Sequence, residues 1–306
     1  MKNIRTDLAL ELSEKFASPP SGVRSEKKEL EEGYVYTKVF IDTEEAGKQM
    51  GKPPGRYFMM ETGDLSSKSR EELYQAAQYT AEAISEMLEG KKCRNALVVG
   101  LGNRAITPDA FGPRVCEKLF VTRHLKEVLP DLFKKDYSEV SAVSPGVLGT
   151  TGVETGEIAR GLSAQIKPDV IIAIDALAAQ KTERIGSSIQ VSDTGITPGS
   201  GIGNKRRALN EKYLGVKVLS VGVPMVTYAA VIACDLLEAA FNKTVEEEDI
   251  NNLFTAIQAA NGSDLIVTPK NIDIIVEKAS TMVSMALNIA LNPGFDAKTA
   301  AEIADI

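Results

Sequence analysis

Histidine is almost absent from this chain: His124 is the only one in 306 residues. A single imidazole excludes a site built on two histidines, and it leaves any Ser-His or Cys-His pair dependent on this one residue. His124 follows a predicted helix in CEKLFVTRHL. A packing or helix-end role there is the favoured interpretation, and a catalytic role is the alternative.

Cysteine is scarce as well. Cys93, Cys116 and Cys234 are odd in number and far apart, and none of them forms a CxxC motif. This pattern indicates neither a disulfide framework nor a zinc site. We expect the three side chains to be small buried hydrophobic groups.

Positive charge is in deficit, with a net charge of −7 and a sequence pI near 5.1. This balance argues against a broad nucleic-acid surface and suits a basic or neutral polypeptide partner. The N-terminal run MKNIRTDLALELSEK carries charges every few positions, so it predicts neither a signal peptide nor a membrane span. We expect a cytoplasmic protein without a membrane partner. The 43% of hydrophobic residues allow a full core.

The residues after about 95 alternate short apolar runs with helical patterns, which is typical of parallel strands covered on both faces. The predicted strands are 96–102, 140–146, 169–177, 216–224 and 264–268; the predicted helices are 113–125, 154–166, 226–241, 248–259 and 271–291. Before them, 34–42 and 56–61 have strand character, 69–88 has helical spacing, and the polar stretch 18–32 is expected to be mobile. The predicted fold is a three-layer α/β/α arrangement with a mostly parallel, doubly wound sheet and additional N-terminal β elements.

Two aspartates are predicted at the carboxyl edge of this sheet. Asp175 directly follows five apolar residues in DVIIAIDAL, and Asp109 lies in the loop GNRAITPDAFGPR. If the first three parallel strands take the order 2-1-3, both acids meet at the point where the winding reverses and ligands bind. Either acid could instead cap the following helix through a backbone N–H.

Two nearby carboxylates favour one protonated and one ionised group, as acid–base hydrolysis by an activated water requires. The same acids could hold a metal, but a catalytic zinc site normally takes at least one histidine. We therefore expect no metal and no cofactor.

A Gly-rich run, SDTGITPGSGIGNKR (192–206), matches neither the P-loop nor the dinucleotide-binding pattern. A surface loop and a substrate-binding lid both remain open as interpretations. A second Gly-rich segment, SPGVLGTTGVETG (144–156), is subject to the same two interpretations.

Taken together, GLGNRAITPDAFGPR, SPGVLGTTGVETGEI, AIDALAA, SDTGITPGSGIGNKR, VTPKNID and the initial RTDLALE closely resemble the germination proteases, spore endopeptidases that degrade small acid-soluble spore proteins. The resemblance runs from about residue 4 to about 290. It implies an aspartic-type peptidase in which Asp109 and Asp175 match the proposed catalytic pair. The implied fold is similar to that of hydrogenase maturation endopeptidases, whose metal ligands are two acids and a His; this chain has no histidine after 124.

The resemblance also implies a self-processing zymogen and a homotetramer in the spore core, with small acid-soluble spore proteins as its protein substrates. Family processing follows an acidic residue that precedes a hydrophobic one and Ala, which predicts cleavage between Asp7 and Leu8. The chain then divides into a propeptide, 1–7, and one α/β peptidase domain, 8–306. The alternative is that Asp7 caps a helix formed by LALELSEKF.

We expect the Gly-rich run to contact the substrate. The residues expected to bind it are Gly199, Gly201, Gly203 and Arg206. The hypothesis for Arg206 is a charge-assisted pair with the acidic residue before the cleaved bond. Two alternatives to the aspartic endopeptidase stay open: a metallopeptidase that uses the same carboxylates, and a non-enzymatic anion-binding α/β protein.

Overall fold

The structure is a computed structural model. It describes residues 6–90, 93–129, 131, 137–199, 207–241, 252, 265–292, 294–295 and 297–304. The expected helix at 248–259 lies almost wholly outside these residues, with residue 252 alone described.

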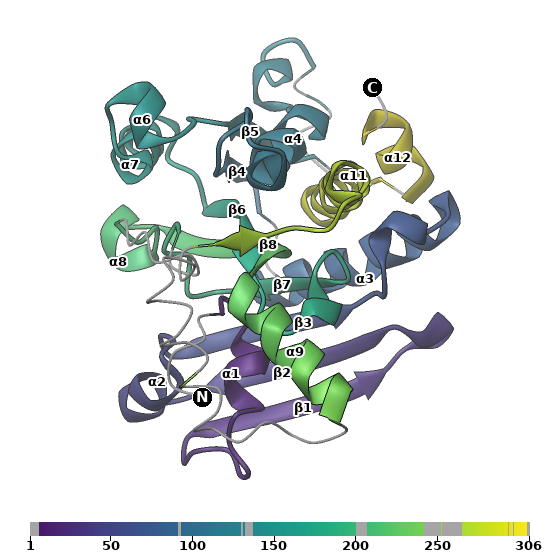
Figure 1. The fold of residues 1–306 in the computed structure, drawn as a ribbon. Helices are drawn as coiled ribbons and strands as arrows, with labels where there is room; N and C mark the ends of the chain where they lie inside the picture. The colour runs from purple at the N-terminus through teal and green to yellow at the C-terminus, as the bar shows by residue number, and fades with distance from the viewer. Residues whose placement is uncertain are drawn as a thin grey trace.

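Within the described residues, one mixed sheet of nine strands runs through the protein in the order β1-β2-β3-β7-β8-β6-β4-β5, with β9 paired to β8 (Figure 1). Its parallel part consists of β4 (Asn95–Gly100), β5 (Glu139–Val143), β6 (Val170–Ala178) and β8 (Lys217–Tyr228). The order β5-β4-β6 is the predicted 2-1-3 arrangement, and the α/β class is confirmed.

The N-terminal strands join the same sheet as an antiparallel meander. They are β1 (Val23–Glu29), β2 (Val35–Ile41) and β3 (Gly55–Glu61), and the meander reaches β8 through β7 (Ser188–Ser192). The expectation of a mobile start is wrong for β1. Only Val23 of this strand is buried, so no apolar alternation marks it, and backbone pairing with β2 holds it in place.

The prediction for the last strand also needs correction. The run 264–268 was expected as a further parallel strand, but β9 (Ile266–Val267) is a two-residue antiparallel strand on β8. Leu265 and Ile266 are 60% and 41% exposed, so their apolar character does not mark a buried strand. The helix expected from 226 begins later, because β8 continues to Tyr228 and α9 (Ala229–Phe241) follows.

Helices cover both faces of the sheet (Figure 1). On one face lie α3 (Arg70–Met87), α4 (Phe111–Lys118) and α11 (Ile272–Leu291); on the other lie α7 (Thr155–Ile166) and α8 (Glu211–Leu214). The remaining helices are α1 (Ala9–Ser13), α2 (Glu44–Met50), α6 (Leu148–Thr151) and α12 (Ala297–Ala304), and the 3-10 turns are η1 (Glu31–Gly33), η2 (Leu65–Ser67), η3 (Thr107–Ala110), η4 (Arg123–Leu125) and η5 (Thr182–Arg184). The α3 helix begins at a capping box between Ser69 and Glu72.

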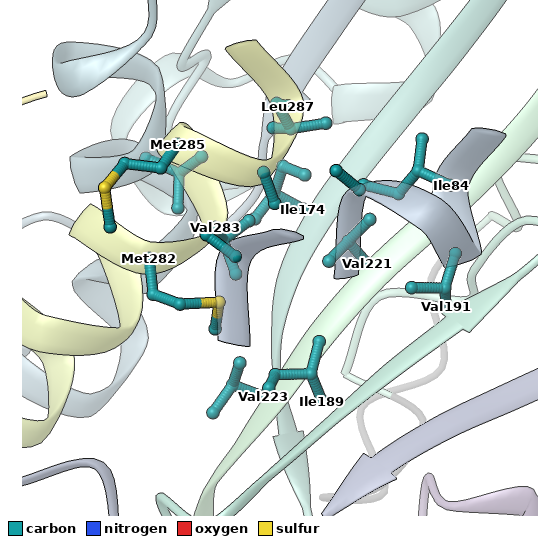
Figure 2. Packing of buried hydrophobic residues seen from close by; sticks show 14 of the residues in the cluster. Ile84, Ile174, Ile189, Val191, Val221, Val223, Met282, Val283, Met285 and Leu287 are labelled. Atoms are coloured by element: carbon teal, nitrogen blue, oxygen red, sulfur yellow. The ribbon is translucent and has the colours of Figure 1, made fainter. Parts of the chain in front are cut away.

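The α11 helix is the centre of the larger core. Figure 2 shows its Met282, Val283, Met285 and Leu287 beside Ile84 of α3 and the strand residues Ile174, Ile189, Val191, Val221 and Val223. By length and composition alone α11 could cross a membrane, but 67% of its most apolar window is buried inside the protein. It is the core helix of this fold.

Candidate active site

The strand β6 extends beyond its neighbour β4 and thereby exposes one side to a loop. Gly100, the last residue of β4, pairs with Ile174, so Asp175 is the first residue of β6 past the end of β4. On its other side Asp175 still pairs with Gly222 of β8. Asp175 therefore lies within the strand, inside the predicted range 169–177, and not in the loop after it. In this position it cannot be a helix cap. Asp175 is only 7% exposed.

Asp109 reaches the same place from the loop after β4. Gly102 has φ +117°, and a Cβ there would lie 2.0 Å from the carbonyl oxygen of Asp109. A Cβ on Gly112 would lie 2.3 Å from the carbonyl oxygen of Leu101. The loop can fold tightly onto β4 only because these positions lack a side chain.

The side chain of Asp109 fastens this loop. Its Oδ2 accepts a hydrogen bond from the backbone N–H of Asn103 at 2.7 Å. The residue lies in η3, and the N-cap position of α4 is Ala110, which makes no side-chain cap. The helix-cap interpretation of Asp109 is therefore wrong.

Both acids line one cavity of about 330 Å³ at the carboxyl edge of the sheet. The loop after β4 contributes Ile106 and Pro108 to its wall, and the end of β6 contributes Leu177 and Ala178. The strand order thus brings Asp109 and Asp175 together, although they are far apart in the sequence.

Asp7 lines the same cavity, and it lies against the end of β6. Its N–H donates to the carbonyl oxygen of Ala178 at 2.9 Å, and the N–H of Ala178 donates to Asp7 Oδ2 at 3.0 Å. Gln190 of β7 donates from Nε2 to the carbonyl oxygen of Asp7 at 3.1 Å. The N-cap of α1 is Leu8, without a side-chain cap, so Asp7 is not the cap of that helix.

The residues after Asp7 are anchored in the protein. Leu8 and Ala9 are fully buried. Glu11, itself 3% exposed, accepts from the backbone N–H groups of Gln180 and Lys181 at 2.7 and 2.9 Å. The predicted processing bond between Asp7 and Leu8 therefore lies in a segment that is held in place, and Asp7 lines the same cavity as the two acids.

The Gly-rich run returns toward the cavity in its first half. Ile196 and Leu209 exchange backbone hydrogen bonds of 2.9 and 2.8 Å, and Ile196, Thr197 and Gly199 line the cavity. Gly201, Gly203 and Arg206 lie outside the described residues. The second Gly-rich segment forms the exposed α6, which contributes nothing to the described wall of this cavity.

His124, Cys93 and Cys116 do not line this cavity. His124 is exposed in η4, next to the start of β5, where the N–H of Thr122 donates to Val140. Burial raises the pKa of the Cys93 and Cys116 thiols to about 12. Such thiols carry little thiolate and act as packing groups, as predicted for these two residues.

A zinc site does not fit the described part of the chain. A catalytic zinc takes three protein ligands, and across the described residues no three His, Cys, Asp or Glu side chains converge on one point.

Sequence reasoning missed two residues around Asp7. Gln190 bridges the segment by also accepting from the N–H of Ala9 at 2.8 Å, and Lys52 lies in an adjoining cavity. No local pattern marks either residue, because both come near Asp7 only through the tertiary fold. The N-terminal segment at Asp7 is thus held against the end of β6, in the cavity that Asp109 and Asp175 line.

Comparison with known proteins identifies the family. Residues 4–244 match the family model described as germination protease. Germination proteases of Clostridium perfringens, Caldanaerobacter subterraneus and Bacillus cereus are 41%, 42% and 36% identical to this chain, over 96% of it in each case and 96%, 96% and 95% of their own lengths. The chain belongs to the germination protease family, and it is accordingly a peptidase of spore germination that acts on protein substrates.

A solved structure is also similar: a [NiFe] hydrogenase maturation protease, HycI, from Thermococcus kodakarensis. It covers 73% of this chain and 99% of its own, with 18% identity and a TM-score of 0.35. A likeness this distant carries no argument about the site.

Proposed function

We propose that the chain is an endopeptidase that initiates the degradation of small acid-soluble spore proteins during germination, with Asp109 and Asp175 as its catalytic pair. The observation that carries this proposal is the single cavity that both acids line. Family membership supports the peptidase activity, and the resemblance of the motifs supports the substrate.

The two carboxylates would divide the proton work of hydrolysis. The ionised acid takes a proton from a water molecule as the oxygen attacks the peptide carbonyl, and the protonated partner donates to the carbonyl oxygen or the leaving amine. The C–N bond then breaks, which releases a carboxylate and an amine. A substrate beside β6 can be held by backbone hydrogen bonds, as the N–H of Asp7 is held by the carbonyl oxygen of Ala178.

The same site supports the proposal of a self-processing zymogen. Residues 1–7 would be the propeptide, 8–306 the peptidase domain, and Asp7-Leu8-Ala9 supplies the acidic, hydrophobic and Ala sequence of a substrate. Because Asp7 lines the cavity of the acid pair, the intact segment would occupy part of the space that a substrate needs. Removal of the segment would open the site.

The remaining parts of the proposal rest on the family resemblance and on composition. The protein would be a homotetramer in the spore core, without a cofactor and without a nucleic-acid or membrane partner. The net charge of −7 suits a basic protein substrate.

Substitution of each acid tests the catalytic pair. Asp109→Asn and Asp175→Asn should each lower kcat on a small acid-soluble spore protein by about 10²- to 10⁴-fold, the usual contribution of a general acid or base. Asp273→Asn, at an exposed position in the first turn of α11, is the matched control and should cleave normally. Normal turnover by either variant of the pair would contradict the proposal.

Activity measurements also test the two alternative functions, a metallopeptidase and a non-enzymatic anion-binding protein. Full activity after dialysis against a chelator would eliminate a metallopeptidase, whereas activity lost in chelator and restored by a divalent metal would establish one. Peptide cleavage that depends on both aspartates would exclude a non-enzymatic anion-binding protein.

A further inference from the structure

A second cavity, of about 320 Å³, adjoins the one that holds the acid pair. The two cavities share four lining residues, Asp7, Leu177, Ile196 and Thr197. The polar side chains around the second cavity include Lys52, Gln190, Thr194, Asn210 and Ser220. Asp7 therefore stands between a space that contains the acids and a polar space that contains a lysine.

Lys52 is placed in this cavity by a fixed turn between α2 and β3. Its backbone N–H donates to the carbonyl oxygen of Gly47 at 3.1 Å, and the Tyr57 hydroxyl donates to the carbonyl oxygen of Pro53 at 2.7 Å. A Cβ on Gly47 would lie only 2.8 Å from the carbonyl oxygen of Lys52. The turn is thus packed tightly against the end of α2, which restricts where the lysine can reach.

The negative charge of Asp7 partly compensates the positive charge of Lys52. Burial lowers the pKa of the Lys52 ammonium, and the negative charge of Asp7 acts in the opposite direction. A buried ammonium group is costly unless an anion compensates it. When residues 1–7 leave, that anion leaves with them, and an acidic residue of a substrate can replace it.

We propose that Lys52 is the specificity-determining residue that holds the acidic side chain before the cleaved bond, first that of Asp7 and then that of a substrate glutamate or aspartate. The backbone N–H of Ala178 donates to Asp7 Oδ2 at 3.0 Å, whereas Lys52 acts on this carboxylate through its charge. The inference rests on the proposed self-processing endopeptidase. It gives Lys52 the role that the sequence alone suggested for Arg206.

A charge exchange within the full chain tests this pair without an added substrate. Cleavage between Asp7 and Leu8 is followed by intact mass and N-terminal sequencing. Asp7→Lys, Lys52→Glu and Lys52→Met should each slow the cleavage at least tenfold, and the double variant Asp7→Lys/Lys52→Glu should recover most of the rate. Lys48→Met is the control, since Lys48 is exposed on α2 and lines neither cavity; it should process normally.

Peptides added to the processed enzyme provide a second readout. Wild type should prefer Glu over Lys before the cleaved bond in kcat/KM, and Lys52→Glu should reverse this preference. Lys52→Met should reduce the preference without reversing it. Melting temperatures close to wild type show that the variants are folded.

The outcomes separate the inference from the proposed function. If Asp175→Asn still processes, or wild type does not cleave at all, the proposed function fails and the inference fails with it. If wild type processes and Asp175→Asn does not, then normal cleavage by Lys52→Met, or absence of rescue in the charge exchange, overturns the Lys52 assignment alone. A loss of preference in Arg206→Ala, with Lys52→Met unchanged, assigns the role to Arg206 instead.

Discussion

Gly102 is the residue on which the position of Asp109 depends most directly. Its φ of +117° is open to glycine and strained for other residues, and any side chain would collide with the backbone of Asp109. The position of Asp109 is thus fixed by the absence of a side chain at Gly102.

We predict that Gly102→Ala displaces the loop after β4. The backbone strain should cost about 1–3 kcal/mol of unfolding free energy, and a shift of Asp109 by about 1 Å should lower kcat about 10²-fold. Gly152→Ala is the matched control, because Gly152 also has a positive φ but a Cβ there would meet nothing within 4 Å. Equal kcat values for both variants, measured beside their denaturation curves, would show that Gly102 does not position Asp109.

For individual residues, the sequence predicted the two acids but not the local structure that surrounds them. A carboxylate after an apolar run and a second one in a Gly-rich loop pointed to a shared edge. Asp175 lies inside the predicted strand 169–177, but the extension of β6 beyond β4 was not predictable, because it is set by pairing with β8. Lys52 was missed because it meets Asp7 through the packing of α2, which no local pattern encodes.

The α1 helix is an element that cannot be stable by itself. It has five residues, and isolated helices of that length do not form in water. It is stabilised by the burial of Leu8, Ala9 and Leu10 in the core. Glu11 and Glu14 add contacts to Arg184, and Glu14 receives two hydrogen bonds from this guanidinium at 3.0 and 2.6 Å. Arg184 is 4% exposed, so these carboxylates also neutralise a buried charge.

The contact predicts an acid-sensitive attachment of the N-terminal segment. Burial raises the pKa of Glu14, but hydrogen bonds from Arg184 and Lys181 outweigh it, so the pKa is lowered from 4.5. Because the folded pKa is lowered, the contribution is present above pH 4.5 and is lost as the pH falls through the folded value. Glu14 is partly exposed, so we expect about 1 kcal/mol or less.

The Glu14→Gln variant measures this contribution. Its melting temperature should lie below that of wild type at pH 7, and the difference should shrink as the pH falls below 4.5. A difference that stays constant from pH 7 to pH 3 would contradict the assignment.

Elements with a strong apolar period were predicted well, and those held by pairing alone were not. The helices α3, α7 and α11 follow their apolar faces closely. The strand β7 has five residues and was missed, since its two neighbours are supplied by distant parts of the chain. Two exposed strands show the same limit. β1 was not predicted, because its exposed residues have no apolar alternation. The run around β9 was predicted as a buried strand because it is apolar, although Leu265 and Ile266 are exposed.

For the whole molecule, α11 is the element that joins the helical layer to the sheet. Leu287→Ala should lower the free energy of unfolding by about 2–5 kcal/mol, because it leaves a cavity at a fully buried position. Ile274→Ala on the same helix should change it by about 0.5 kcal/mol or less, since Ile274 is 46% exposed. Chemical denaturation compares the two; similar losses would mean that α11 does not form the core described here.

The pairing of β3 with β7 joins the N-terminal meander to the rest of the sheet, and this has a consequence during synthesis of the chain. The meander is complete at residue 61, but the strand that pairs with its inner edge begins only at residue 188. During synthesis β3 therefore presents an open edge, next to Phe58, Met59 and Met60, until the ribosome has passed Ser192. Open apolar edges recruit strands from other molecules. Until β7 emerges, the edge of the meander at β3 is open to such a partner.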